Sequence, residues 1–214
     1  MKNIPDDLIV IVDYGLGNTQ SVGNALRHLG YKFLITNDHQ EIAKASALII
    51  PGVGSFGEAM RNLEKFNLIE VLNDEVLCKK KNVLGICLGM QIFAESSEED
   101  PNYKGLGWIP GKVIAIKPPA QYRVPHVGWN NLEIKIKSPL FDKNTADPNF
   151  YFDHSYHFAA NPDFVAAFCD YGIKLTAAIQ KDNIYGAQFH PEKSQTNGLK
   201  LFRSFFDKLN IEHQ

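Results

Sequence analysis

The first part of the chain alternates short apolar runs with segments whose apolar residues recur every three or four positions. The apolar runs are predicted to be strands, over residues 8–12, 33–35, 47–50 and 83–86. Between the first two, a helical pattern carries Val22, Leu26 and Leu29 and ends at Gly30, which suits a helix C-cap. Two more helices are predicted over residues 57–65 and 68–80. This alternation predicts a parallel sheet with helices on both faces, where a continuously apolar strand is buried on both sides.

The second half of the chain has apolar runs without long helices between them. Strands are predicted over residues 112–117, 132–136, 150–152, 165–168, 176–180 and 184–189. Such close spacing favours antiparallel pairing. The chain closes with an amphipathic helical pattern whose apolar residues are Leu199, Phe202, Phe205, Phe206 and Leu209. We therefore expect one α/β domain over residues 1–214. Its sheet is mixed, mainly parallel and flanked by helices, as in flavodoxin-like folds, with an antiparallel edge in the second half.

Charge and cysteine content narrow the possible functions. Lys and Arg number 22 and Asp and Glu 24, a net charge of -2 that gives no electrostatic reason to expect a nucleic-acid or membrane partner. The N-terminal residues resemble neither a signal peptide nor a membrane span. The three cysteines, Cys78, Cys87 and Cys169, cannot form a disulfide framework and suit a reducing compartment. We expect a cytoplasmic location.

The most specific local motif is Gly85-Ile86-Cys87-Leu88-Gly89, where a predicted strand ends and a helix is expected to begin. It copies the nucleophile elbow known for serine, in which both glycines are needed because a β-carbon would collide with the crossing backbone. Peptide dipoles at the helix N-terminus would favour the thiolate of Cys87, and the Leu88 N–H could donate to an oxyanion. Many such cysteines are only small buried hydrophobes, so a nucleophile also requires a base.

His190 is the histidine best placed to be that base. It directly follows the strand predicted over residues 184–189, at the sheet edge where sites form in parallel sheets, and Pro191 forces the chain to turn there. Glu192 can point back at the imidazole and fix its tautomer. The His-Pro-Glu segment alone could be an ordinary loop, but together with the elbow it predicts a Cys87, His190 and Glu192 triad.

A glycine-rich segment, Pro51-Gly52-Val53-Gly54, follows the third predicted strand. It would lie beside the elbow and could present a second N–H to the oxyanion. The same residues would also serve a plain strand-to-helix turn.

Together these motifs resemble the class I, or triad, glutamine amidotransferases, through Gly-x-Cys-x-Gly followed by Gln91 and through the later His-Pro-Glu. Within that family the chain is similar, over essentially its whole length, to the glutaminase subunits of imidazole glycerol phosphate synthase. The segments that carry this narrower resemblance are Asp13-Tyr14-Gly15-Leu16-Gly17-Asn18, Pro51-Gly52-Val53-Gly54-Ser55-Phe56, Val124-Pro125-His126-Val127-Gly128-Trp129-Asn130 and His154-Ser155-Tyr156.

The resemblance implies a glutaminase that passes ammonia to a barrel-shaped cyclase subunit, which makes imidazole glycerol phosphate in histidine biosynthesis. It assigns the oxyanion hole to Gly52, Val53 and Leu88. Glutamine binding would fall to Gly54, Gln91, Ser155 and Tyr156, and the docking face or ammonia path to Asn18, His126 and Trp129. It implies a glutaminase that is weak until the cyclase binds, and we expect that binding to realign the Gly52–Val53 peptide. No cofactor and no metal is expected, since His154 and His157, three apart on one strand, would point to opposite faces.

Other functions stay open. Asp153 stands where relatives commonly carry an apolar residue. Its carboxylate could be a local hydrogen-bond acceptor on an exposed strand face, or it could mark a paralogue that supplies ammonia for amidine formation on surface-polysaccharide sugars. A flavodoxin-like binding subunit would use Gly15-Leu16-Gly17 to hold a phosphate, although the further glycine of the dinucleotide motif is missing. A catalytically silent scaffold and a cysteine hydrolase acting on peptides or esters are the remaining alternatives.

Overall fold

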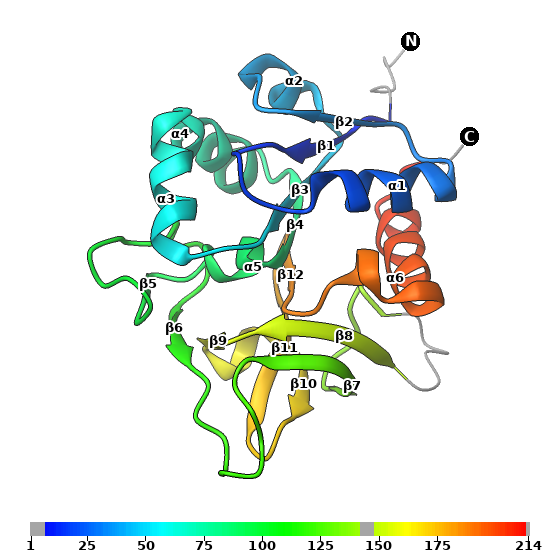
Figure 1. Cartoon of the computed structure of the whole chain (residues 1–214). Helices are drawn as coiled ribbons and strands as arrows, with labels where there is room; N and C mark the ends of the chain where they lie inside the picture. The colour runs from blue at the N-terminus through cyan, green and yellow to red at the C-terminus, as the bar shows by residue number, and fades with distance from the viewer. Residues whose placement is uncertain (1–6, 142–147, 213–214) are drawn as a thin grey trace.

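A twisted sheet of nine strands runs through the middle of the part of the chain that the computed structural model describes, residues 7–141 and 148–212 (Figure 1). Its strand order is β2-β1-β3-β4-β12-β11-β10-β7-β8. The parallel strands are β1 (Ile9–Val12), β2 (Phe33–Thr36), β3 (Ala47–Gly52), β4 (Asn82–Cys87) and β12 (Ile184–Ala187). The antiparallel strands are β7 (His126–Ile134), β8 (Asn149–His154), β10 (Val165–Asp170) and β11 (Lys174–Lys181). The predicted mixed sheet with an antiparallel edge is confirmed.

A small second sheet lies beside the first. Its three strands among the described residues are β5 (Ser96–Ser97), β6 (Gly111–Ala115) and β9 (Tyr156–Ala160). The sequence predicted β6 but not β9, which pairs with it in antiparallel fashion. Because β9 follows β8 after a single bend residue, it sets Ser155 and Tyr156 beside the end of the main sheet.

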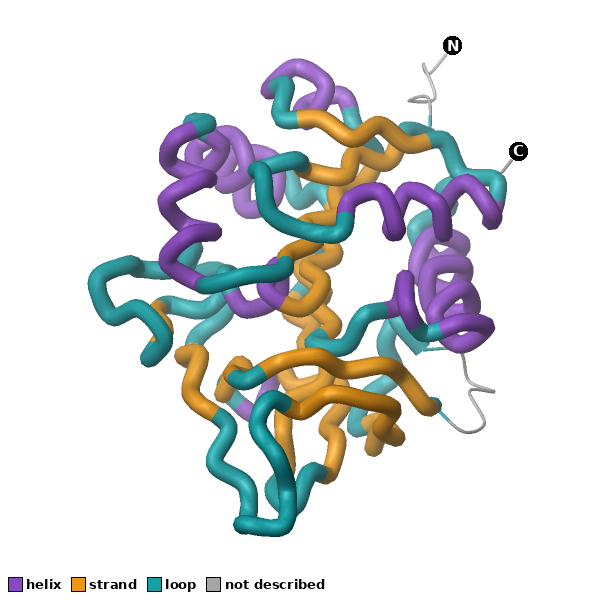
Figure 2. The backbone as a smooth tube through the Cα atoms, viewed as in Figure 1, coloured by secondary structure: helices purple, strands orange, loops and turns teal. Residues whose placement is uncertain are grey.

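Helices cover both faces of the sheet, as predicted (Figure 2). One face carries α1 (Thr19–Leu29) and α6 (Gln195–Lys208), and the other carries α3 (Phe56–Lys65), α4 (Leu68–Asn73) and the short α5 (Leu88–Gln91). Gly30 caps α1 in the left-handed conformation at φ 83°, as its position predicted. The helix predicted over residues 68–80 is divided into α4 and a π-helical turn, Asp74–Cys78. A further helix, α2 (His39–Lys44), was not predicted.

Side chains of β1 show why its residues are all apolar. Ile9 and Ile11 belong to the core under α1 and α6, while Val10 and Val12 belong to the core under α3 and α4. All four are fully buried because successive strand residues point to opposite faces and both faces are covered. The carboxyl ends of the parallel strands meet at one edge of this sheet, and Cys87 and His190 lie at this edge.

Candidate functional site

The chain makes a strained turn at Cys87, where β4 ends and α5 begins. Cys87 has φ 54° and ψ −111°, a conformation that side chains with a β-carbon rarely adopt. The glycines on either side are required by close backbone contacts. A β-carbon at Gly85 would lie 2.6 Å from the carbonyl oxygen of Gly89, and one at Gly89 would overlap the carbonyl oxygen of Ile50. The geometry therefore has the features predicted for a nucleophile elbow.

The helix after the elbow is a single turn, shorter than the sequence suggested. α5 spans four residues, because the next carbonyls accept hydrogen bonds from a following loop: Leu106 donates to Ile92, and Ile109 donates to Phe93. One turn aligns few peptide dipoles, so the helix contributes less to a thiolate than a long helix would. Electrostatic interactions with this sulfur therefore come mainly from neighbouring side chains.

His190 and Glu192 lie next to the elbow because β12 is the parallel neighbour of β4. The strands pair Gly186 with Gly85, and Gly186 lies four residues before His190. His190 Nδ1 lies 2.8 Å from Glu192 Oε1, and the two side chains are 2% and 1% exposed. Burial opposes protonation of His190, but hydrogen bonds to Cys87 and Glu192 outweigh it and raise the pKa of the imidazole to about 10. The arrangement favours a protonated imidazole at His190, beside the sulfur of Cys87.

The segment Pro51–Gly54 does lie beside the elbow. Gly52 pairs with Cys87 across β3 and β4, and a β-carbon on Gly52 would lie 2.8 Å from the Gly89 nitrogen. The buried Tyr14 hydroxyl donates to the Pro51 carbonyl at 2.8 Å and fixes this strand end. The parts assigned to Gly52, Val53 and Leu88 in an oxyanion hole stay predictions.

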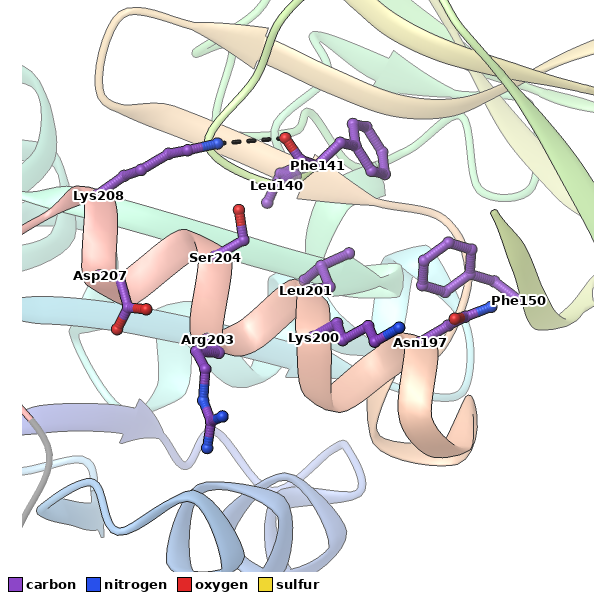
Figure 3. Close-up of a pocket in the computed structure, with 10 residues that line it drawn as sticks. All are labelled: Leu140, Phe141, Phe150, Asn197, Lys200, Leu201, Arg203, Ser204, Asp207 and Lys208. Carbon is purple, nitrogen blue, oxygen red and sulfur yellow. Dashed lines mark hydrogen bonds between the residues drawn. The ribbon is translucent and has the colours of Figure 1, made fainter. Parts of the chain in front are cut away.

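A cavity of about 280 Å³ opens in front of Cys87 and His190. The four residues predicted to bind glutamine, Gly54, Gln91, Ser155 and Tyr156, all line it. A larger cavity of about 410 Å³ lies beside α6 (Figure 3), but none of its ten lining residues is a cysteine or histidine. Because the predicted nucleophile and base, Cys87 and His190, line the smaller cavity, that cavity is the candidate active site.

Two residues near Cys87 were missed by the sequence reasoning. Glu99 lines the cavity, and its Oε2 accepts a hydrogen bond of 2.8 Å from the backbone N–H of Phe56 at the start of α3. Gln188 is fully buried, with Nε2 3.6 Å from Cys87 Sγ. Glu99 falls in a run of acidic residues that is typical of a solvated loop. Gln188 falls inside an apolar strand pattern. Neither local pattern therefore indicates a functional residue.

The residues assigned to the docking face lie in different environments. Trp129 is 46% exposed and Asn18 is half-buried at the N-cap of α1. His126 is only 2% exposed and its Nδ1 lies 3.0 Å from Nε2 of the buried His154. Its burial leaves little of the ring exposed to a partner, so of its two predicted places the ammonia path suits it better than the docking face. A place for His126 along an ammonia path stays a prediction.

The assumption that His154 and His157 share a strand is wrong, because β8 ends at His154 and β9 begins at Tyr156. Within residues 7–141 and 148–212, no group of three or more His, Cys, Asp or Glu side chains is arranged to hold a metal ion. Over the same part of the chain, no helix has the length and apolar character needed to span a membrane.

Comparisons with known proteins show the family of the chain. Residues 10–209 match the family model described as glutamine amidotransferase class-I. The chain is 50% identical over 205 residues to imidazole glycerol phosphate synthase subunit HisH 2 of Vibrio vulnificus, covering 95% of this chain and 96% of that protein. It is 47% identical over 200 residues to subunit HisH of Methanothermobacter thermautotrophicus, covering 94% and 98%.

Solved structures agree on the fold. A glutamine amidotransferase crystal structure superposes with a TM-score of 0.73 at 18% identity, covering 94% of this chain and 99% of that chain. A chain of PurLQS from Thermotoga maritima superposes with a TM-score of 0.72 at 17% identity, covering 95% and 99%.

Proposed function

The chain belongs to the class I glutamine amidotransferase family and, within it, to the HisH subunits of imidazole glycerol phosphate synthase, and on that premise we propose how its site works. It hydrolyses glutamine to glutamate and ammonia with Cys87, His190 and Glu192, and delivers the ammonia to a cyclase subunit that makes imidazole glycerol phosphate. The observation that carries this proposal is the buried His190–Glu192 pair beside a strained cysteine at the floor of a cavity.

Acylation begins with the Cys87 thiolate. Its sulfur attacks the carboxamide carbon of glutamine, forming a C–S bond and a tetrahedral oxyanion. Backbone N–H groups of Leu88 and of the Gly52–Val53 segment stabilise that charge. His190, protonated at this stage, gives its proton to the departing nitrogen, so ammonia leaves as the C–N bond breaks. Glu192 holds Nδ1 of the imidazole, which leaves Nε2 for this proton transfer.

Deacylation reverses the proton movement. His190 removes a proton from water, which attacks the glutamyl thioester, and the C–S bond breaks to release glutamate and the Cys87 thiolate. One proton of the water ends on the imidazole, which restores the thiolate and imidazolium pair for the next cycle. The other leaves the new carboxyl group for solvent, because glutamate is released ionised.

Glu99 suits recognition of the α-ammonium group of glutamine. Its carboxylate lies at the cavity, held by the Phe56 N–H, and a charge-assisted hydrogen bond is the strong way to fix an ammonium group. Ser155 and Tyr156 form another wall of the cavity, where their polar groups suit the remaining polar groups of the substrate.

The cyclase docks, in this proposal, on the outer face of β7 and β8. Val127 and Trp129 are 53% and 46% exposed there, and Trp129 packs on Tyr151 of β8. Val127 pairs with Asp153, which lines the cavity, so the apolar patch continues to the mouth of the site. An aromatic side chain at the centre of such a patch is a usual anchor for a protein partner.

This docking face is tested with Trp129→Ala, which should weaken binding to the cyclase by about tenfold or more. Leu34→Ala is the matched control, because Leu34 is also an exposed apolar residue but lies on β2, at the opposite edge of the sheet. Equal affinity of both variants for the cyclase would contradict the assignment.

The Gly52–Val53 peptide is the proposed point of activation by the partner. Glycine tolerates two peptide orientations, so docking could turn an N–H toward the oxyanion. Removing one oxyanion donor raises the barrier by about 2.7–4 kcal/mol, enough to keep the free subunit nearly idle. The same peptide orientation in free and loaded complexes would contradict this step.

The test of the main proposal is glutamate release from glutamine by the wild type and by Cys87→Ala, alone and with the cyclase and its ribonucleotide ligand. We expect turnover that needs both Cys87 and the loaded cyclase. Cys87-dependent turnover without cyclase dependence would favour the sugar-amidination paralogue, and no Cys87-dependent turnover would leave a binding subunit.

We further propose that the chain acts as one glutaminase domain and works in the reducing cytoplasm, where three free thiols including the nucleophile persist.

A further inference from the structure

Gln188 makes a contact with the nucleophile that the triad does not include. It follows β12 directly, two residues before the base, and its side chain is fully buried. Its Nε2 lies 3.6 Å from Sγ of Cys87, although 101 residues separate the two along the chain. The effect of a buried amide on a neighbouring sulfur atom depends on which amide atom faces the sulfur. The NH₂ group can donate a hydrogen bond to the sulfur, whereas the oxygen cannot.

The surrounding hydrogen bonds fix that orientation. The Tyr156 carbonyl oxygen can only accept, so the side-chain group of Gln91 that lies 2.9 Å from it is the NH₂ group. The same Gln91 nitrogen lies 3.0 Å from Gln188 Oε1, and its second hydrogen is used there. With its oxygen committed to Gln91, Gln188 presents its own NH₂ group to Cys87.

The same chain of contacts limits what Gln91 can do for a substrate. Both N–H bonds of Gln91 are directed at protein acceptors, and the side chain is 5% exposed. Only its Oε1 is left to accept a hydrogen bond from a molecule in the cavity.

We propose that Gln188 is a hydrogen-bond donor to the Cys87 thiolate, held in place by Gln91 and by the Tyr156 carbonyl. An N–H donor favours the charged form of a sulfur over the neutral thiol. The Gln188 donor would therefore stabilise the charged sulfur together with His190, because the single turn of α5 contributes little. In the catalytic cycle, which rests on the proposed glutaminase function, the sulfur is charged before the attack and again when the thioester breaks, so the donor acts at both points.

The test is the rate at which iodoacetamide alkylates Cys87 in the full chain, followed by peptide mapping across the pH range in which the fold is intact. Only the thiolate displaces iodide and forms the new C–S bond. Gln188→Met keeps the side-chain length and removes the donor. We expect the midpoint of the alkylation profile to rise by about one pH unit, a tenfold smaller thiolate fraction below that midpoint.

Two controls separate this contact from general damage. The exposed Cys78 is alkylated in the same sample, and its profile should not move. Gln180→Met makes the same chemical change on the neighbouring strand, where Gln180 pairs with Tyr185 at the other end of the β11–β12 hairpin. A Cys87 midpoint that is unchanged in Gln188→Met, or that moves equally in Gln180→Met, would overturn the proposal.

If Gln188→Met does not fold, the midpoint of the Cys87 alkylation profile is measured in Gln188→Glu instead. Its carboxylate still accepts from Gln91 but places a second oxygen against the sulfur, so the midpoint should rise further than in Gln188→Met. A midpoint at or below the wild-type value would overturn the proposal. Neither measurement needs glutamine or a partner: a shifted midpoint in a protein without glutaminase activity would support the contact and reject the proposed function.

Discussion

Replacing Glu192 with glutamine tests how much the buried contact to the base contributes to catalysis. The carboxylate oxygen lies 2.8 Å from His190 Nδ1, and both side chains are almost completely shielded from water. A hydrogen bond to a charged group is worth about 1.5–3 kcal/mol, and each 1.36 kcal/mol in a barrier is tenfold in rate. We therefore expect Glu192→Gln to lower kcat for glutamine hydrolysis by about 10- to 150-fold.

The pH profile gives this prediction a second, independent readout. Hydrogen bonding and charge from Glu192 are among the causes that raise the pKa of His190, so their loss lowers it. The proton donor to ammonia would then be lost at lower pH, and the alkaline limb of the profile should move toward neutral pH.

A matched control separates the effect of burying an ion pair from the effect of the distance between its atoms. Lys174 and Glu133 form an ion pair of 2.7 Å in which the side chains are 59% and 65% exposed. Glu133→Gln makes the same chemical change in a pair whose length differs by only 0.1 Å, and kcat should stay at the wild-type value because solvent screens such pairs. The reasoning is refuted if Glu192→Gln leaves both kcat and the alkaline limb where the control leaves them.

Three more outcomes are expected. Gly89→Ala should lower the free energy of unfolding by about 1–3 kcal/mol in urea titrations, because its β-carbon overlaps backbone; unchanged stability would mean that the elbow relaxes freely. Glu99→Gln should raise KM for glutamine about tenfold with little change in kcat, and the opposite split would contradict ammonium recognition. Burial lowers the pKa of His126 to about 4 and of His154 to about 3. The unfolded chain therefore binds protons below about pH 6.5 that the fold does not, and the free energy of unfolding should fall as pH drops from there toward 4. His126→Asn should reduce the dependence of the free energy of unfolding on pH, and an unchanged dependence would contradict this role of His126.

Local patterns predicted much of the fold because they report burial along one element. The apolar run at residues 8–12 could only be a strand covered on both faces, and β1 is such a strand. α2 was missed because its six residues are too few for a periodic pattern, and it depends on the Asp38 cap. β9 was missed because Tyr156 and His157 interrupt its apolar character, and only pairing with β6 makes it a strand.

The residues of the candidate site likewise fall into those that local sequence predicted and those that it did not. Cys87, His190 and Glu192 were predicted because a turn, a strand end and a proline mark their positions in the sequence itself. Gln188 and Glu99 have no such marks, since each matters only through a contact with a distant segment. The shortness of α5 was hidden for the same reason: it is imposed by hydrogen bonds from the loop that contains Leu106.

The position of β12 has a consequence for synthesis of the protein. β12 lies between β4 and β11 in the middle of the sheet, yet it comes from near the end of the chain. Until it has been made, β4 keeps an unpaired edge, and Cys87 has neither its proposed base, His190, nor Gln188 beside it. A growing chain on the ribosome therefore carries an unactivated thiol. The proposed reactive centre is completed only by a strand that also joins the parallel and antiparallel halves of the sheet, so reactivity of Cys87 would report that the two halves have come together.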